Sequence, residues 1–210
     1  MRNFVAKAPQ KTLSLFIGAF VVAASSWAGN KVSNGASNAL NDSPAGFQET
    51  LSLQGLTFKL SSPNDQSINN LTIEAKGLKQ KAEPIRREID GTISGAEVAD
   101  LNVDGFPEVY VYATSAGSGS YGSVVAFSSN KNKSLSEIYV TPIEKVKKAS
   151  KGYMGHDEFS VVESTLVRRF PVYRQGDINA KATGGMRQIH YKLKAGEAGW
   201  VLVPARVEEY

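Results

Sequence analysis

Residues 109–113 read Val-Tyr-Val-Tyr-Ala, and this stretch decides the fold because apolar and polar-tipped side chains alternate along it. Side chains of a β-strand point in turn to the two faces of a sheet, so a period of two predicts a strand and not a helix. The same period returns at residues 188–193, which read Gln-Ile-His-Tyr-Lys-Leu. The two stretches predict a protein built from β-sheet.

Further short β-rich runs lie on both sides of residues 109–113, and glycine, asparagine or proline separates them. Turn residues between short apolar runs are typical of antiparallel strands that follow one another along the chain. We therefore predict an all-β fold, either an antiparallel β-sandwich or a flattened barrel. The expected strands are residues 49–53, 56–60, 71–75, 85–93, 109–114, 123–128, 159–163, 166–173, 187–193 and 199–207.

One short helix is expected within this all-β fold, beginning at Thr141 and ending near Gly152. Residues 141–144 read Thr-Pro-Ile-Glu. This order places a hydroxyl cap, a first-turn proline and a carboxylate where a helix N-terminus favours them.

The first 28 residues have the layout of a secretory signal peptide. Arg2, Lys7 and Lys11 precede an apolar run at residues 13–24, and Ser-Trp-Ala at 26–28 offers a cleavage site. The apolar run is shorter than the roughly 20 residues that span a bilayer. We predict cleavage after Ala28, a periplasmic location, and no membrane segment in the mature chain.

Residues 29–46 are mostly Asn, Ser, Ala and Gly, a composition that favours a flexible leader because it offers little apolar surface to bury. The β domain is expected at residues 47–210. Cleavage removes three cations and no anion, so the net charge falls from +4 to about +1. A nucleic-acid-binding surface would keep its basic residues, so nucleic acid is not an expected partner. Cysteine is absent, which excludes disulfides.

Residues 100–105 read Asp-Leu-Asn-Val-Asp-Gly, which has the spacing of a calcium-binding loop. The twelfth position of such a loop is a chelating glutamate, whereas Val111 stands there and a strand follows. An ordinary turn is therefore the preferred interpretation. A calcium site formed by Asp100, Asn102, Asp104 and Glu108 is the alternative, and no other metal or cofactor is expected.

Residues 117–122 read Gly-Ser-Gly-Ser-Tyr-Gly and match the letters of a dinucleotide-binding fingerprint. That fingerprint needs a helix N-terminus to follow, whereas the residues after Gly122 are strand-like. Neither Ser118 nor Ser120 has the two flanking glycines of a nucleophile elbow. We interpret the segment as a hairpin tip with hydroxyl and amide donors and one tyrosine. A merely solvated loop is the alternative.

Residues 168–173 read Arg-Arg-Phe-Pro-Val-Tyr. Neighbouring residues of a strand face opposite sides, so Arg168 and Arg169 share one face only if the strand bends. One arginine is expected to cover the sheet, and the other to be free for acidic groups of a partner. His156, Asp157 and Glu158 are adjacent too, so they are not expected to converge on one metal ion.

The signal peptide, the loop at residues 118–121 and the stretch at residues 169–173 occur in an order that resembles the periplasmic inhibitors of invertebrate-type (I-type) lysozyme. The similarity runs from about Asp100 to Trp200. The resemblance implies a β-rich inhibitor without enzymatic activity, which inserts its loop into the substrate cleft of the lysozyme.

The resemblance also implies binding residues and partners. The implied partners are an I-type lysozyme and, because members of the family form homodimers, a second copy of the chain. The lysozyme-binding residues carried over are Ser118, Gly119, Ser120 and Tyr121 in the loop, with Arg169, Phe170 and Tyr173 in the second motif.

Two other functions stay open on the sequence alone. One is a periplasmic module that binds glycan or peptidoglycan fragments without inhibiting a lysozyme; its stacking surfaces would be Tyr110, Tyr112, Tyr121 and Trp200. The other is a cell-wall hydrolase, which needs two carboxyl groups across a groove. Its candidate pairs are Asp157 with Glu158, and Asp104 with Glu108.

Overall fold

The computed structural model describes residues 46–146 and 148–210. The signal peptide predicted at 1–28 lies outside the described residues, as does the leader predicted at 29–46 apart from Gly46. Within the described ranges, no helix is long and apolar enough to cross a membrane.

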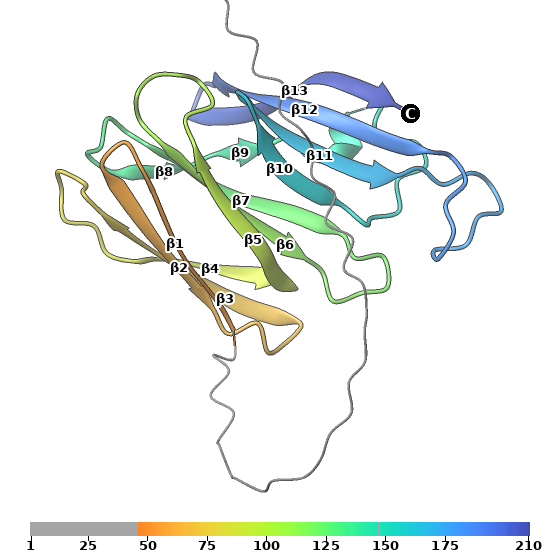
Figure 1. Cartoon of the computed structure of the whole chain (residues 1–210), viewed down its shortest axis with the longest axis horizontal. Coiled ribbons are helices and arrows are strands. Elements are labelled where there is room, and N and C mark those ends of the chain that lie inside the picture. Colours follow the sequence, from red (N-terminus) through yellow and green to blue (C-terminus); the bar gives the residue numbers. More distant parts are fainter. Residues whose placement is uncertain (1–45, 147) are drawn as a thin grey trace, which may run out of the picture. The chain divides into compact units, whose positions relative to one another are not determined.

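Three β-sheets make up the described part of the chain (Figure 1). The N-terminal sheet has the strand order β1-β2-β3-β4, the central sheet β5-β6-β7-β8, and the C-terminal sheet β10-β11-β12-β13-β9. All neighbouring strands are antiparallel except β13 and β9, which are parallel.

The strands have the following bounds. The N-terminal sheet contains β1 (Phe47–Leu53), β2 (Leu56–Ser62), β3 (Ile68–Lys76) and β4 (Ile85–Asp90). The central sheet contains β5 (Thr92–Ala99), β6 (Glu108–Thr114), β7 (Gly122–Ser129) and β8 (Leu135–Glu137). The C-terminal sheet contains β9 (Tyr139–Val140), β10 (Glu158–Val162), β11 (Thr165–Pro171), β12 (Met186–Ala195) and β13 (Trp200–Glu209).

Strand β6 is buried on both faces, and this places the central sheet between the other two. Val109, Val111 and Ala113 pack into one apolar cluster with residues of the N-terminal sheet. Tyr110 and Tyr112, which point the other way, pack into a second cluster with residues of the C-terminal sheet. The alternation at 109–113 therefore predicts the strand correctly, but the tyrosines are core residues and the sheets form three layers.

The chain passes from the N-terminal sheet to the central sheet at Gly91. This residue has φ +101°, and a Cβ there would lie 2.0 Å from the carbonyl oxygen of Thr114. Only glycine tolerates both conditions. The side-chain amide of Asn69, which is buried, donates to the Gly91 carbonyl oxygen at 2.7 Å and fixes the crossing.

The prediction of an all-β fold is confirmed, and the ten expected strands correspond to strands of the structure. The run predicted at 85–93 is divided at Gly91 between β4 and β5. Most of β5, and the short strands β8 and β9, were not predicted. These strands take their pairing from partners elsewhere in the fold, and their own residues show little alternation.

The helix expected from Thr141 to Gly152 is wrong in length, because the structure has a three-residue 3-10 turn, η1 (Ile143–Lys145). The Thr141 hydroxyl does not cap it but donates to the Leu202 carbonyl oxygen of β13 at 2.8 Å. Further along, the Arg187 guanidinium donates to the carbonyl oxygens of Ala149 and Lys151. Contacts with the C-terminal sheet therefore replace the hydrogen bonds that a longer helix needs.

The packing of the N-terminal sheet against the central sheet predicts how much stability is lost when a side chain between them is shortened. Phe58 on β2 is fully buried there, so Phe58→Ala should lower the free energy of unfolding by about 3 to 5 kcal/mol. Its neighbour Lys59 is exposed, so Lys59→Ala should stay within about 0.5 kcal/mol of the unsubstituted protein. Urea unfolding measures both values, and equal stabilities of the two variants would contradict the packing of these layers.

Candidate functional site

The hairpin loop that joins β6 to β7 carries the residues predicted to bind a lysozyme. The Ser115 N–H donates to the Tyr121 carbonyl oxygen at 2.9 Å, which closes the loop. Inside it, the Ser120 N–H donates to Gly117 O at 2.9 Å, and the Tyr121 N–H donates to the Ser115 hydroxyl oxygen at 3.0 Å. Ser118 at the tip is exposed. The loop is thus an ordered turn with an open tip.

Gly119 and Tyr121 fit each other within this loop. The Tyr121 ring lies so close that a Cβ at position 119 would be 2.4 Å from the ring. Ser120 between them has φ 44°, a left-handed conformation that folds the ring back over the glycine. The Tyr121 side chain keeps about half of its surface exposed. The spacing of glycine and tyrosine therefore has a steric reason.

Two other segments hold the loop by its backbone. The His156 N–H donates to the Gly119 carbonyl oxygen at 2.8 Å, and a Cβ on Gly155 would lie 2.0 Å from that same oxygen. The Asn179 side-chain amide donates to the carbonyl oxygen of Ser118. Both anchors come from segments at least 35 residues further along the chain, and sequence reasoning did not identify them.

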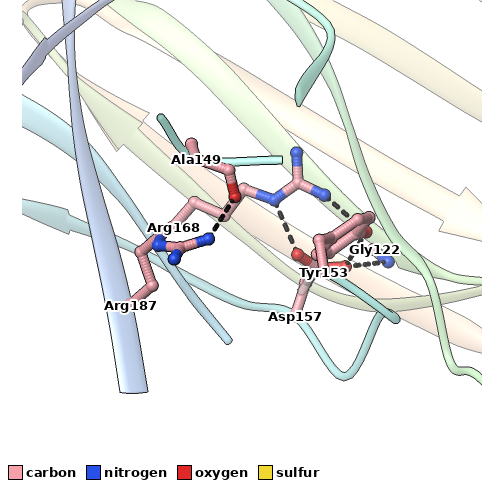
Figure 2. A network of polar contacts seen from close by, with 6 residues as sticks. All are labelled: Gly122, Ala149, Tyr153, Asp157, Arg168 and Arg187. Carbon is pink, nitrogen blue, oxygen red and sulfur yellow. Dashed lines mark hydrogen bonds and ion pairs between the residues drawn. The ribbon is translucent and has the colours of Figure 1, made fainter. Parts of the chain in front are cut away.

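Asp157 connects the base of the loop to the C-terminal sheet, as Figure 2 shows. Its side chain has no exposed surface. One carboxylate oxygen accepts a hydrogen bond from Arg168 Nε at 2.6 Å. The other accepts from the Tyr153 hydroxyl at 2.6 Å and from the Gly122 N–H, at the start of β7, at 2.7 Å. Every Asp157 contact is therefore with a donor, which suits a buried carboxylate.

Arg168 is the positive partner in this network, and aromatic rings surround its guanidinium group. The group lies 5.0 Å from the Tyr153 ring centroid, 5.4 Å from that of Phe159 and 5.8 Å from that of Phe170. Burial alone would lower the pKa of Arg168, but the hydrogen bond and charge of Asp157 outweigh it and raise that pKa. Burial also raises the pKa of the Tyr153 hydroxyl. The network thus favours the charged form of the Arg168 guanidinium and the neutral form of the Tyr153 phenol.

The second predicted motif divides into one exposed residue and two buried ones. Arg169 is exposed and forms an ion pair with Glu158, which is exposed too. Phe170 has no exposed surface and packs edge-on against Tyr153 at 4.8 Å between ring centroids. The Tyr173 hydroxyl donates to the Asn179 carbonyl oxygen at 2.8 Å. Arg168 is thus buried and Arg169 exposed, in agreement with the expected division between the two arginines, but Arg169 is not free because it already pairs with Glu158.

The turn at residues 100–105 is closed by its own polar side chains. The carboxylate of Asp100 accepts from the N–H groups of Asp104 and Gly105, and Asp104 accepts from the Phe106 N–H. Carboxylate oxygens of Asp100, Asp104 and Glu108 lie within 4.8 Å of one another. The turn interpretation agrees with these hydrogen bonds, and the calcium alternative, which also includes Asn102, stays a prediction.

The structure also locates the residues of the other two hypotheses. Tyr110 and Tyr112 are buried in the core, so neither ring can stack on a glycan. The Asp157 side chain is buried in its ion pair, while that of Glu158 is exposed, so these two carboxylates do not face each other across a groove. Among the residues that the structure describes, those at 156–158 do not form a metal-ligand cluster.

Because of the buried Asp157–Arg168 pair, we expect substitutions of the neighbouring residues Arg168 and Arg169 to differ greatly in their effect on the free energy of unfolding. Arg168→Met leaves Asp157 buried without its cation and should lower the free energy of unfolding by about 3 to 5 kcal/mol. The matched control, Arg169→Met, removes an exposed ion pair and should change it by less than about 1 kcal/mol. Urea unfolding compares the two variants. A stable Arg168→Met protein would show that the ion pair does not hold the site together.

The buried carboxyl group of Glu108 should make the stability of the protein depend on pH. Burial raises the pKa of this carboxyl to about 7, and the nearby charges of Asp100 and Asp104 add to the effect. Between about pH 4.5 and 7 the folded protein then binds more protons than the unfolded chain. Its free energy of unfolding should therefore fall as the pH rises through this window, by at most about 3 kcal/mol.

The test of this pH dependence is urea unfolding at several pH values between 4 and 8, compared with Glu108→Gln. The variant has no titrating group at this position, so the difference between the two curves isolates Glu108. Parallel curves throughout the window would show that Glu108 keeps an ordinary pKa.

A comparison with known protein families finds a match that includes the hairpin loop. Residues 82–152 match the family described as periplasmic lysozyme inhibitor of I-type lysozyme. The resemblance predicted from the sequence is confirmed over this segment, which contains the loop at 118–121. The lysozyme inhibitor family is named for blocking an enzyme and not for catalysis, in agreement with the prediction that the chain is not an enzyme.

The match to the lysozyme inhibitor family ends before Asp157 and before the second motif. The similarity expected from there to Trp200 therefore stays a prediction. No curated protein and no solved structure matches the chain.

Proposed function

We propose that the protein is a periplasmic inhibitor of an I-type lysozyme, and that it blocks the enzyme by inserting residues 118–121 into the substrate cleft. The family match, which includes this loop, supports the choice of target. The observation that carries the proposal is the form of the loop, an exposed tip whose backbone is anchored at Ser118 and Gly119.

The chemistry of the loop suits a cleft that contains carboxylates. The catalytic groups of a glycoside hydrolase are two carboxyl groups, one of which is ionised. Residues 115–121 contain hydroxyl groups and backbone amides but no acidic side chain. Ser118 at the tip is exposed and can donate its hydroxyl hydrogen, and the half-exposed Tyr121 ring adds apolar contact area.

The anchors lower the entropy that the loop loses on binding. A loop already held in one conformation loses less freedom when a partner immobilises it. Here the contacts of His156 with Gly119 and of Asn179 with Ser118 use carbonyl oxygens. The Ser118 side chain is therefore left for the partner.

The second motif acts in two ways in this proposal. Arg169 contacts the lysozyme directly by exchanging its exposed partner Glu158 for an acidic group of the enzyme; an exposed pair is weak enough for this exchange. Phe170 and Tyr173 act from behind the loop. Phe170 packs against Tyr153, and Tyr173 holds the Asn179 segment that binds Ser118.

The test follows the clearing of a bacterial cell-wall suspension by an I-type lysozyme, with chicken-type and goose-type lysozymes as specificity controls. The double variant Ser118→Ala/Tyr121→Ala should inhibit the I-type enzyme at least about ten-fold more weakly, because central interface residues contribute about 2 kcal/mol or more. The control Val103→Ser alters a residue that is 77% exposed in the turn at 100–105 and should inhibit like the unsubstituted protein.

Unchanged inhibition by a folded double variant would remove the loop from the mechanism while leaving the target intact. If the unsubstituted protein slowed none of the three lysozymes, the inhibitory function itself would be wrong. If the protein cleared the suspension alone, it would be a hydrolase.

A further inference from the structure

A cavity of about 330 Å³ adjoins the hairpin loop on the side of the C-terminal sheet. Residues of the central sheet, of the C-terminal sheet and of η1 line it. Leu166 and Tyr191 belong to the C-terminal sheet, Val124 to β7 and Ile143 to η1, and the partly exposed Tyr121 stands at its edge. The cavity is large enough for a small organic molecule, and much of its wall is apolar.

Tyr191 gives this cavity an unsatisfied donor. Its side chain is 1% exposed, and its hydroxyl oxygen has no hydrogen-bond partner in the described part of the chain. Tyr191 lines the cavity together with Arg168, whose charge and N–H groups act on the hydroxyl oxygen. Arg168 can only donate, so the hydroxyl hydrogen of Tyr191 still lacks an acceptor among the described residues. Buried polar groups in folded proteins are nearly always paired, so this hydroxyl needs an acceptor in the adjoining cavity, which the polar group of a bound molecule can supply.

Arg168 supplies a second donor without supplying net charge. Its guanidinium group donates through Nε to Asp157 and through Nη2 to Tyr153, and it also interacts with the Tyr191 hydroxyl. A guanidinium group has five N–H groups, so donors remain on the side of the cavity that Arg168 lines. The positive charge is already balanced by Asp157. Glu144, which also lines the cavity, is exposed and places a carboxylate at the opening. An anionic ligand would therefore meet more negative than positive charge, whereas a neutral acceptor meets two donors.

We propose that this cavity binds the acetamido group of an N-acetylated small molecule. The carbonyl oxygen accepts from the Tyr191 hydroxyl and from Arg168, the methyl group lies against the apolar lining, and the N–H donates to Glu144 at the opening. The inference stands on the cavity and its donors alone, and it does not depend on the inhibition of a lysozyme.

Tyr191→Phe tests the role of the hydroxyl group directly, because it removes that group and keeps the ring. The Tyr191 hydroxyl makes no hydrogen bond of good geometry to a described residue, so the variant should fold with a stability close to that of the unsubstituted protein. The matched control is Tyr110→Phe. Tyr110 is a buried tyrosine outside the cavity whose hydroxyl donates to Glu108 at 3.4 Å.

The experiment is a titration of the full chain, followed through the amide NMR signals of Gly122, Val124 and Ile143. The probes are N-acetylglucosamine and N-acetyl-alanine methylamide, which carry the same acetamido group on a sugar and on a peptide. Glucose and acetate are the control ligands. We expect saturable shifts with at least one acetamido probe and none with glucose, and about ten-fold weaker binding to Tyr191→Phe but not to Tyr110→Phe.

The stronger of the two probes identifies the natural source as an acetylated sugar or an acetylated peptide. The proposal is overturned if neither acetamido probe gives saturable shifts, if acetate binds better than both, or if Tyr191→Phe binds the probes like the unsubstituted protein. Tyr191→Phe should still inhibit an I-type lysozyme, so this result and the inhibitory function can fail separately.

Discussion

The buried ion pair between Asp157 and Arg168 is the interaction on which the site depends. A carboxylate without exposed surface is stable only if donors surround it, and Asp157 finds them on the C-terminal sheet, in Tyr153 and at the first residue of β7. The pair therefore joins two sheets at the base of the hairpin loop. The aromatic rings around Arg168 exclude water from it and so strengthen the attraction.

Local alternation made most of the fold predictable. The period of two at residues 109–113 and 188–193 marks β6 and β12 correctly, because strand side chains alternate whatever they pack against. The number of layers was not predictable, since a tyrosine with one polar tip suits either a wet face or a core. Burial decides this for Tyr110, which belongs to the second apolar cluster. The prediction of a short helix failed because Arg187, which is distant in sequence, donates hydrogen bonds to the carbonyl oxygens of Ala149 and Lys151.

The candidate site was predictable only where its residues are adjacent in sequence. The hairpin tip at 117–122 and the opposite orientation of Arg168 and Arg169 follow from local patterns, whereas the binding role of residues 118–121 came from the family resemblance and stays a proposal. The anchors do not follow from local patterns, since nothing at Asn179 or Asp157 indicates a partner some 35 to 60 residues earlier in the chain. Gly119 and Gly155 are each required by a close approach within the site, but they lie far apart in the sequence, so only the structure shows that they belong together.

The way in which the loop is held has a consequence for its capacity to change. The anchors bind the carbonyl oxygens of Ser118 and Gly119, so the restraint at the tip does not use the Ser118 side chain. The side chain at position 118 can then vary while the turn keeps its shape. The tip can therefore change its chemistry by single substitutions at position 118 without a change in the conformation of the turn.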